Sequence, residues 1–146
     1  MDSHNGKYKY SADSFGTHYK ILEMISDDCL VLDIGCASGY LGEYLKKEKK
    51  CKLWGVEPDK NSYEQAIISN SYEKVFNYSV DYFLSNIDLE IKFDVIILAD
   101  VLEHLFDPIK TLIGLKKNLN ENGKIIISLP NIAYYRIRLA LLLGSF

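Results

Sequence analysis

The sequence predicts an α/β fold: a mainly parallel, doubly wound sheet with helices on both faces. Its 146 residues, 48% hydrophobic and 25% charged, suit one globular domain with a real core. Five short apolar runs alternate with segments of helical periodicity, as expected of strands joined by helical crossovers. Glycines and carboxylates follow several of these runs, and in such sheets ligands bind at the carboxyl ends of the strands.

The first half of the chain contains two strand predictions and three helix predictions. Apolar spacing indicates the first helix, CLVLDIG reads as a buried strand, and a Gly35–Gly39 turn leads into the second helix. Asp59 is a plausible N-cap for the third helix. In chain order, we expect a helix over 16–27, a strand over 29–35, a helix over 40–49, a strand over 52–58 and a helix over 59–70.

The second half continues the alternation. FDVIILAD is the strongest strand signal, and the helix after it has Asp107 as N-cap, Pro108 in its first turn and Gly123 at its end. In chain order, we expect a weak strand over 74–80, strands over 93–100 and 124–130 with a helix over 107–123 between them, and a final helix over 132–143. Residues 1–15 are polar with tyrosines, so we expect an N-terminal arm there and a domain over residues 16–146.

Composition narrows the class of protein. The net charge of −3 gives no bulk attraction for nucleic acid. Cys29, Cys36 and Cys51 are odd in number and form no CxxC pair, which indicates free thiols in a reducing compartment and no metal site. No signal peptide and no membrane-spanning apolar run is visible. We therefore expect a cytoplasmic protein without a membrane partner.

A carboxylate and a glycine turn follow the first predicted strand. Asp33 precedes Gly35, Ala37 and Gly39, and glycine lets a backbone approach a ligand closely. The dinucleotide pattern G-x-G-x-x-G fails, because Ala37 and Tyr40 stand where its second and third glycines belong. Asp33 would suit a cationic or hydroxyl-bearing ligand better than a pyrophosphate.

Carboxylates also follow the second and third predicted strands. Glu57 lies 22 residues after Gly35, near the spacing of a carboxylate that binds ribose hydroxyls. Asp81 could accept a hydrogen bond from the exocyclic amine of an adenine. The alternatives are a surface acid at Glu57 and a helix cap at Asp81.

The fourth and fifth strand ends carry further polar residues. If a helical turn starts at Asp100, then Asp100, Glu103 and His104 share one face and form a titratable cluster. The alternative is a capping box made by Asp100 and Glu103. Asn131, after the fifth strand, either caps the last helix or lines the substrate side.

Taken together, these segments resemble class I S-adenosylmethionine-dependent methyltransferases. The resemblance covers roughly residues 16–135 and implies the Rossmann-like core of that family. It is closest to the group that methylates small molecules, ubiquinone-type precursors and glycans. The matching segments are VLDIGCASGYLGEYL (31–45), GVEPD (55–59), FDVIILADVLEHLFDP (93–108) and GKIIISLPN (123–131).

The resemblance implies S-adenosylmethionine as cofactor, S-adenosylhomocysteine as product and a small-molecule or glycan acceptor. His104 is the first candidate for a general base and Asp100 the second. The implied cofactor contacts are Asp33 with the methionine amino group; Gly35, Cys36, Ala37, Gly39 and Tyr40 in the turn; Glu57 with the ribose; Pro58 and Asp81 with the adenine; Ala99 and Asp100 beside the methionine portion; and Tyr8, Tyr10 or Tyr19 as a cover.

Two departures from the family pattern bear on the expected function. Ala37 replaces the usual middle glycine, a small change that should be tolerated. The family sheet normally has two further strands, whereas this sequence ends in the apolar LALLLGSF, so we expect an incomplete domain that forms a homodimer through its last helix. The alternative function is a non-catalytic or inactive S-adenosylmethionine-binding fragment. A nicotinamide-dependent dehydrogenase and a nucleic-acid-modifying enzyme fit the motifs less well.

Overall fold

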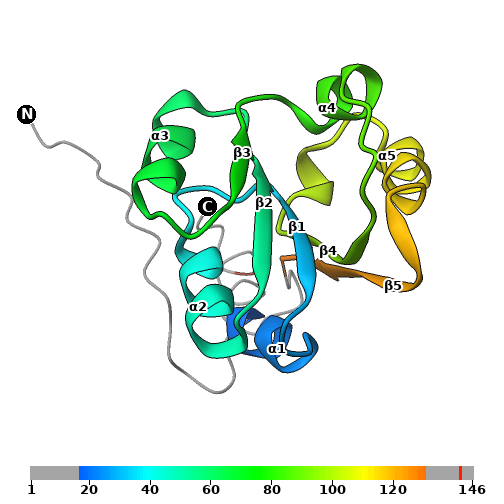
Figure 1. The fold of residues 1–146 in the computed structure, drawn as a ribbon. Coiled ribbons are helices and arrows are strands. Elements are labelled where there is room, and N and C mark those ends of the chain that lie inside the picture. The colour runs from blue at the N-terminus through cyan, green and yellow to red at the C-terminus, as the bar shows by residue number, and fades with distance from the viewer. Residues whose placement is uncertain (1–16, 131–141, 143–146) are drawn as a thin grey trace, which may run out of the picture.

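The computed structural model describes residues 17–130 and residue 142. Five parallel strands form one sheet in the order β3-β2-β1-β4-β5 (Figure 1). The strands are β1 (Leu30–Ile34), β2 (Lys52–Val56), β3 (Lys74–Phe76), β4 (Phe93–Ala99) and β5 (Leu119–Ser128). The predicted parallel α/β fold is therefore confirmed. The chain first adds β2 and β3 on one side of β1, and then adds β4 and β5 on the other side.

The two central strands make up most of the buried sheet. β1 pairs with β2 from Leu30 opposite Lys52 to Ile34 opposite Val56, and on its other side it pairs with β4. Both strands are apolar almost throughout, because helices cover both of their faces. This register brings the carboxyl ends of β1, β2 and β4 to one edge of the sheet, which we call the carboxyl edge.

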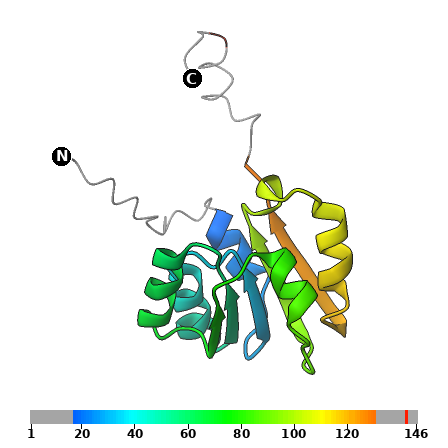
Figure 2. The same ribbon diagram turned by 90° about the horizontal axis from the view of Figure 1, so that it is seen from above.

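The helices divide into two layers. They are α1 (Thr17–Glu23), α2 (Tyr40–Lys49), α3 (Lys60–Ile68), α4 (Val80–Asn86) and α5 (Pro108–Lys116), with a short 3₁₀ helix η1 (Leu102–His104) after β4. Buried residues of α1 and α2, such as Ile21 and Leu45, share a core with Val31. On the opposite face, Phe83 of α4 and Leu115 of α5 share a second core with other strand residues. Figure 2 shows α5 and β5 together at one side of the molecule.

Side-chain caps explain where α3 and α5 begin. Asp59 accepts from Ser62 N at 2.8 Å ahead of α3, as the sequence predicted. Asp107 accepts from Lys110 N at 3.0 Å ahead of α5. Pro108 then occupies the first helical position, where no amide hydrogen is needed.

The predicted helix over 107–123 was wrong in its second half. α5 ends at Lys116, and β5 begins at Leu119 with Leu119 paired to Phe93. Gly123 is therefore a strand residue and does not end the helix. A Cβ at Gly123 would lie 2.9 Å from Phe93 O, so the close approach of β4 explains the glycine.

The predicted strand over 74–80 was also too long, and a helix was missed. β3 stops at Phe76, and Ser79 caps α4 by accepting from Tyr82 N at 3.3 Å. α4 forms because Val80 and Phe83 are buried. Smaller differences affect other predicted ends: α1, β2 and α3 end at Glu23, Val56 and Ile68, short of the predicted ends at 27, 58 and 70.

Several sequence predictions lie outside the described residues. These are the N-terminal arm with Tyr8 and Tyr10, Asn131 and the final helix with its proposed dimer contact. Among the described helices, none is long and apolar enough to cross a membrane.

Candidate functional site

The turn between β1 and α2 has an unusual backbone. Gly35, Ala37 and Gly39 have φ angles of 73°, 47° and 89°, so three of five consecutive residues are left-handed. Glycine adopts this conformation without strain, whereas alanine pays about 1–2 kcal/mol because its Cβ crowds the next carbonyl. The structure therefore accepts Ala37 at some cost in stability.

Neighbouring elements press closely on this turn. A Cβ at Gly35 would lie 2.6 Å from Cγ2 of Val101, which precedes η1. A Cβ at Gly39 would lie 2.8 Å from Ser69 Oγ, just after α3. The glycines thus serve close packing as well as backbone conformation.

Glu57 holds the turn to the end of β2. Its Oε2 accepts from Ala37 N at 2.9 Å, and its Oε1 accepts from Asp59 N at 2.9 Å. The carboxylate is only 8% exposed, and Asn77 Nδ2 donates to the carbonyls of Glu57 and Pro58 at 2.8 and 3.0 Å. Each carboxylate oxygen has a second lone pair, so Glu57 can still accept from a ligand hydroxyl.

Asp33 lies beneath the same turn and is 2% exposed. Its Oδ2 accepts from Tyr72 OH at 2.7 Å. Burial raises the pKa of Asp33 to about 7, the Tyr72 hydrogen bond lowers it, and the nearby charge of Glu57 raises it further. Burial also raises the pKa of the Cys36 thiol, so Cys36 is a neutral packing residue beside the two acids.

A second polar group lies at the ends of β4 and β5. Asp100 Oδ1 accepts from Ser128 Oγ at 2.8 Å, while Asp100 N donates back to Ser128 Oγ at 3.0 Å. Across the edge, His18 Nε2 lies 2.8 Å from Tyr40 OH, and the two rings meet edge to face. Burial lowers the pKa of His18, and the charge of Asp100 opposes that shift.

The predicted helical face of Asp100, Glu103 and His104 is not formed. Asp100 has a φ of 54°, and only Leu102–His104 form a 3₁₀ turn, so the spacing of an α-helix does not apply. The N-cap position of η1 is Val101, and no side chain caps this turn, so the alternative capping box of Asp100 and Glu103 is not formed either. Glu103 and His104 are both exposed at the carboxyl edge.

The remaining predicted contacts are spread over the same edge. Pro58 is exposed at the end of β2, and Ala99 pairs with Ser128 at the end of β4. Asp81 does not cap α4, because Ser79 does. It lies instead in the first helical turn, where its Oδ1 accepts from Thr111 Oγ1 at 3.4 Å.

Sequence reasoning missed three residues of this site. Tyr72 stands in a polar loop before β3, and no local pattern reveals its hydrogen bond to Asp33. His18 lies on α1 beside Tyr19, a predicted cover residue, and only the fold brings His18 to Tyr40. Asn77 directly follows β3, so the rule that ligands lie after strands could have drawn attention to it.

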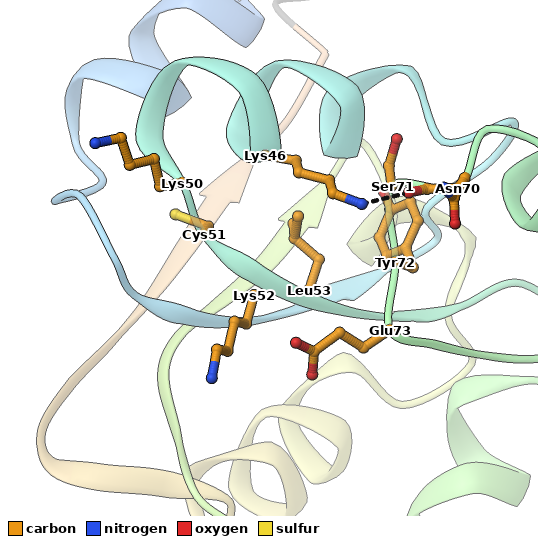
Figure 3. A pocket seen from close by; sticks show the side chains of 9 residues that line it. All are labelled: Lys46, Lys50, Cys51, Lys52, Leu53, Asn70, Ser71, Tyr72 and Glu73. Atoms are coloured by element: carbon orange, nitrogen blue, oxygen red, sulfur yellow. Dashed lines mark hydrogen bonds between the residues drawn. The ribbon is translucent and has the colours of Figure 1, made fainter.

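A hollow away from the carboxyl edge is lined by residues of α2, β2 and the loop before β3. It measures about 440 Å³ and lies at the amino ends of β2 and β3, as Figure 3 shows. Lys46 Nζ there donates to Asn70 O at 2.6 Å, and the side chains of Lys50 and Lys52 diverge. In the described part of the chain, no group of three or more His, Cys, Asp or Glu side chains could hold a metal ion.

Known proteins share this fold. The structure of the plantazolicin methyltransferase BpumL in complex with SAH is 23% identical, with a TM-score of 0.68 over 85% of this chain and 48% of that one. A TehB-like SAM-dependent methyltransferase from Corynebacterium glutamicum is 23% identical, with a TM-score of 0.61 over 75% of this chain and 59% of that one. The chain thus has the fold of class I S-adenosylmethionine-dependent methyltransferases.

Relatives in sequence cover a similar part of the chain. The tRNA U34 carboxymethyltransferase of Campylobacter fetus is 36% identical over 112 residues, which are 68% of this chain and 36% of that protein. The mitochondrial ubiquinone biosynthesis O-methyltransferase of Dictyostelium discoideum is 31% identical over 112 residues, 69% of this chain and 35% of that protein. The chain therefore spans about a third of the length of these relatives. Because the family described as methionine biosynthesis protein MetW matches residues 16–145, the chain belongs to the MetW family.

Proposed function

We propose that this chain binds S-adenosylmethionine at its carboxyl edge and forms the cofactor-binding part of a methyltransferase. The observation that carries the proposal is the link from Glu57 Oε2 to Ala37 N at 2.9 Å. This bond brings the acid at the end of β2 to the left-handed turn after β1. The fold and the relatives named as methyltransferases support the same function.

The residues at this edge fit the chemistry of the cofactor. Gly35 and Gly39 adopt the positive φ angles of the turn without strain, so its backbone can approach a nucleoside, and Glu57 offers lone pairs to ribose hydroxyls. When it is ionised, above its pKa of about 7, the buried Asp33 adds negative charge below the turn, which favours a cationic ligand. When bound, the sulfonium supplies an activated methyl group, so the protein contributes mainly position and charge.

We propose a small-molecule acceptor, or a glycan, as the first candidate. The ubiquinone O-methyltransferase relative and the family description, methionine biosynthesis, both concern small molecules. A tRNA acceptor is the second candidate, because the tRNA U34 carboxymethyltransferases have higher identities, up to 36%. The net charge of −3 favours the first.

If the acceptor is a hydroxyl, it needs a base. His104 is our first candidate because it is exposed on η1 at the carboxyl edge, where an acceptor could reach it. Asp100 is the second candidate, although its Oδ1 is already bonded to Ser128.

The location and the oligomeric state stay predictions. The three free cysteines agree with a cytoplasmic location. The homodimer stays a prediction.

The experiment is isothermal titration of the protein with S-adenosylhomocysteine. We expect one binding site, and we expect Glu57→Gln to weaken binding about 10- to 100-fold, the value of one or two charge-assisted hydrogen bonds. Glu64→Gln, an exposed acid on α3, is the matched control and should bind normally. Unchanged affinity in a folded Glu57→Gln protein would place the ribose elsewhere.

A methyl-transfer assay then separates the functions. Labelled S-adenosylmethionine is incubated with the protein and, in separate arms, with small-molecule extract or tRNA. Label in the small-molecule arm supports the first candidate, and label in the tRNA arm supports the second. Binding without transfer in either arm indicates the alternative, a non-catalytic binding module.

A further inference from the structure

Two of the three cysteines lie side by side at the amino end of the sheet. Cys29 directly precedes β1, and Cys51 directly precedes β2. The first residues of these two strands, Leu30 and Lys52, pair with one another. The residue before each of them is a cysteine, so the two cysteines lie opposite each other. Lys52 N donates to Cys29 O at 3.0 Å, which extends the parallel ladder to this pair.

Backbone hydrogen bonds hold the two segments together on both sides of the cysteine pair. On one side Asp28 N donates to Lys49 O at 2.8 Å, and on the other side lies the bond from Lys52 N. Neighbouring strands are about 4.8 Å apart, and a disulfide needs Cα atoms about 4.4–6.8 Å apart. The backbone spacing therefore allows a bond between the two sulfurs.

Both thiols lie on the same face of the sheet. Cys51 belongs to the core that α1 and α2 share with β1, and Cys29 packs against that core. Cys51 Sγ donates to Ser26 O at 3.7 Å, in the loop that leads to Cys29. The pair thus shares one face of the sheet as well as one register position.

We propose that Cys29 and Cys51 form a reversible disulfide, with a small-molecule disulfide such as glutathione disulfide as the oxidant. The Cys29 thiolate attacks one sulfur of the oxidant, whose sulfur–sulfur bond breaks and releases one thiolate. The Cys51 thiolate then attacks the sulfur of Cys29 and displaces the second thiolate. The two protons of the protein thiols end on the released thiolates. The protein is therefore oxidised by two electrons, and the oxidant is reduced to two thiols.

Exposure and charge favour this order of steps. Cys29 is partly exposed, whereas Cys51 is 4% exposed. Lys50 and Lys52 flank Cys51, as Figure 3 shows, and neither forms an ion pair within residues 17–130. Glutathione disulfide carries a net negative charge, so these two lysines favour its approach to the pair.

The surroundings of the thiols set the rate of the first attack. Burial raises the pKa of Cys29, Asp94 raises it further, and Lys124 opposes the rise. Burial also raises the pKa of Cys51 to about 11, which the Cys29 backbone and Lys49 oppose. Little thiolate is present at neutral pH, so we expect the bridge to form over hours rather than seconds.

The test is incubation of the whole folded chain with excess glutathione disulfide, without denaturant, followed by mass spectrometry. We expect the unmodified chain to lose two hydrogen atoms and to yield peptides linked through Cys29 and Cys51. Excess reduced glutathione should then restore the original mass. This measurement needs no substitution, so it does not depend on whether a variant folds.

Single substitutions test the order of the steps. In Cys51→Ser, Cys29 should stop as a mixed disulfide that keeps one glutathione. In Cys29→Ser, no bridge can form, and the buried Cys51 should take up glutathione about tenfold more slowly than Cys29 does. The matched control is Cys36→Ser, because Cys36 lies beyond the other end of β1. This variant should form the bridge at the normal rate.

Several results would overturn the inference. A folded chain that keeps its mass after a day of incubation would do so, and so would an unmodified chain that stops at a mixed disulfide with glutathione. A linked peptide that contains Cys36 or joins two chains would show that Cys29 and Cys51 do not meet. A bridge that excess reduced glutathione cannot open would contradict its reversibility. None of these outcomes involves a ligand of the carboxyl edge, so the proposed function is tested separately.

Discussion

Replacing Asp33 by Asn should stabilise the protein near neutral pH. Asp33 is 2% exposed, and burial raises its pKa from the ordinary 3.8 to about 7. A pKa difference of about 3 units between the folded and unfolded states corresponds to about 4 kcal/mol, at about 1.4 kcal/mol per unit. Asn can keep the hydrogen bond from Tyr72 without carrying a charge, so it escapes the cost of burying that charge.

The sign of the pH dependence follows from linkage. Between pH 3.8 and about 7, the folded state holds a proton on Asp33 that the unfolded state has lost. Stability from this group is therefore full below pH 3.8 and is lost as the pH rises through about 7. The advantage of Asp33→Asn should grow across this window and level off above it, reaching about 4 kcal/mol.

Urea unfolding of both proteins from pH 4.5 to 8 measures this difference directly. The expected result is that the free energy of unfolding of Asp33→Asn, minus that of the unmodified chain, rises by about 1.4 kcal/mol per pH unit below pH 7. A flat difference would show that Asp33 does not titrate in this range. A flat difference would also result if the Tyr72 hydrogen bond outweighed burial and depressed the pKa of Asp33, because the carboxyl would then be ionised in both states across this range.

Three further substitutions test the packing and backbone around the site. Ala37→Gly should raise the free energy of unfolding by about 1 kcal/mol, because a φ of 47° strains alanine; thermal unfolding that shows a loss would contradict this. Gly42→Ala should cost about 1–3 kcal/mol, because its Cβ would lie 2.5 Å from Cζ of Tyr72; a neutral result in urea unfolding would mean that the ring moves freely. Asp107→Ala should cost about 1 kcal/mol through the lost cap on Lys110 N, measured by the same method, and no loss would show that the α5 cap is dispensable.

Much of the fold could be predicted from the sequence because its signals are local. The apolar runs that became β1 and β4 are buried on both faces and leave little choice of structure. Asp59 and Asp107 predicted the starts of α3 and α5, because each side-chain cap bonds to a backbone amide only three residues further along the chain. The acids that follow strand ends also reached the expected edge, because parallel strands bring their carboxyl ends together.

The errors came where tertiary contacts override local patterns. Gly123 resembled a helix stop, but its lack of a side chain allows the close approach of Phe93 in β4. The segment after Phe76 resembled a strand until Ser79 capped a helix whose Val80 and Phe83 are buried. Neither effect can be read from neighbours in the sequence.

The acidic residues of the site could be predicted from the sequence, but their hydrogen-bond partners could not. Tyr72 is 39 positions from Asp33, and His18 is 22 positions from Tyr40, so both hydrogen bonds exist only once the sheet has formed. Asp100 was expected on a helical face with His104, but its left-handed φ directs the chain differently and pairs Asp100 with Ser128. The chemistry of single residues was thus easier to anticipate than their neighbours.

The most direct measurement is a crystal structure of the chain soaked with S-adenosylhomocysteine. We expect the nucleoside to lie across the turn after β1, with ribose hydroxyls within about 3.2 Å of the Glu57 carboxylate. A nucleoside bound away from Glu57, such as in the hollow at the amino ends of β2 and β3, would contradict this, and so would a carboxyl edge that stays empty at saturating ligand.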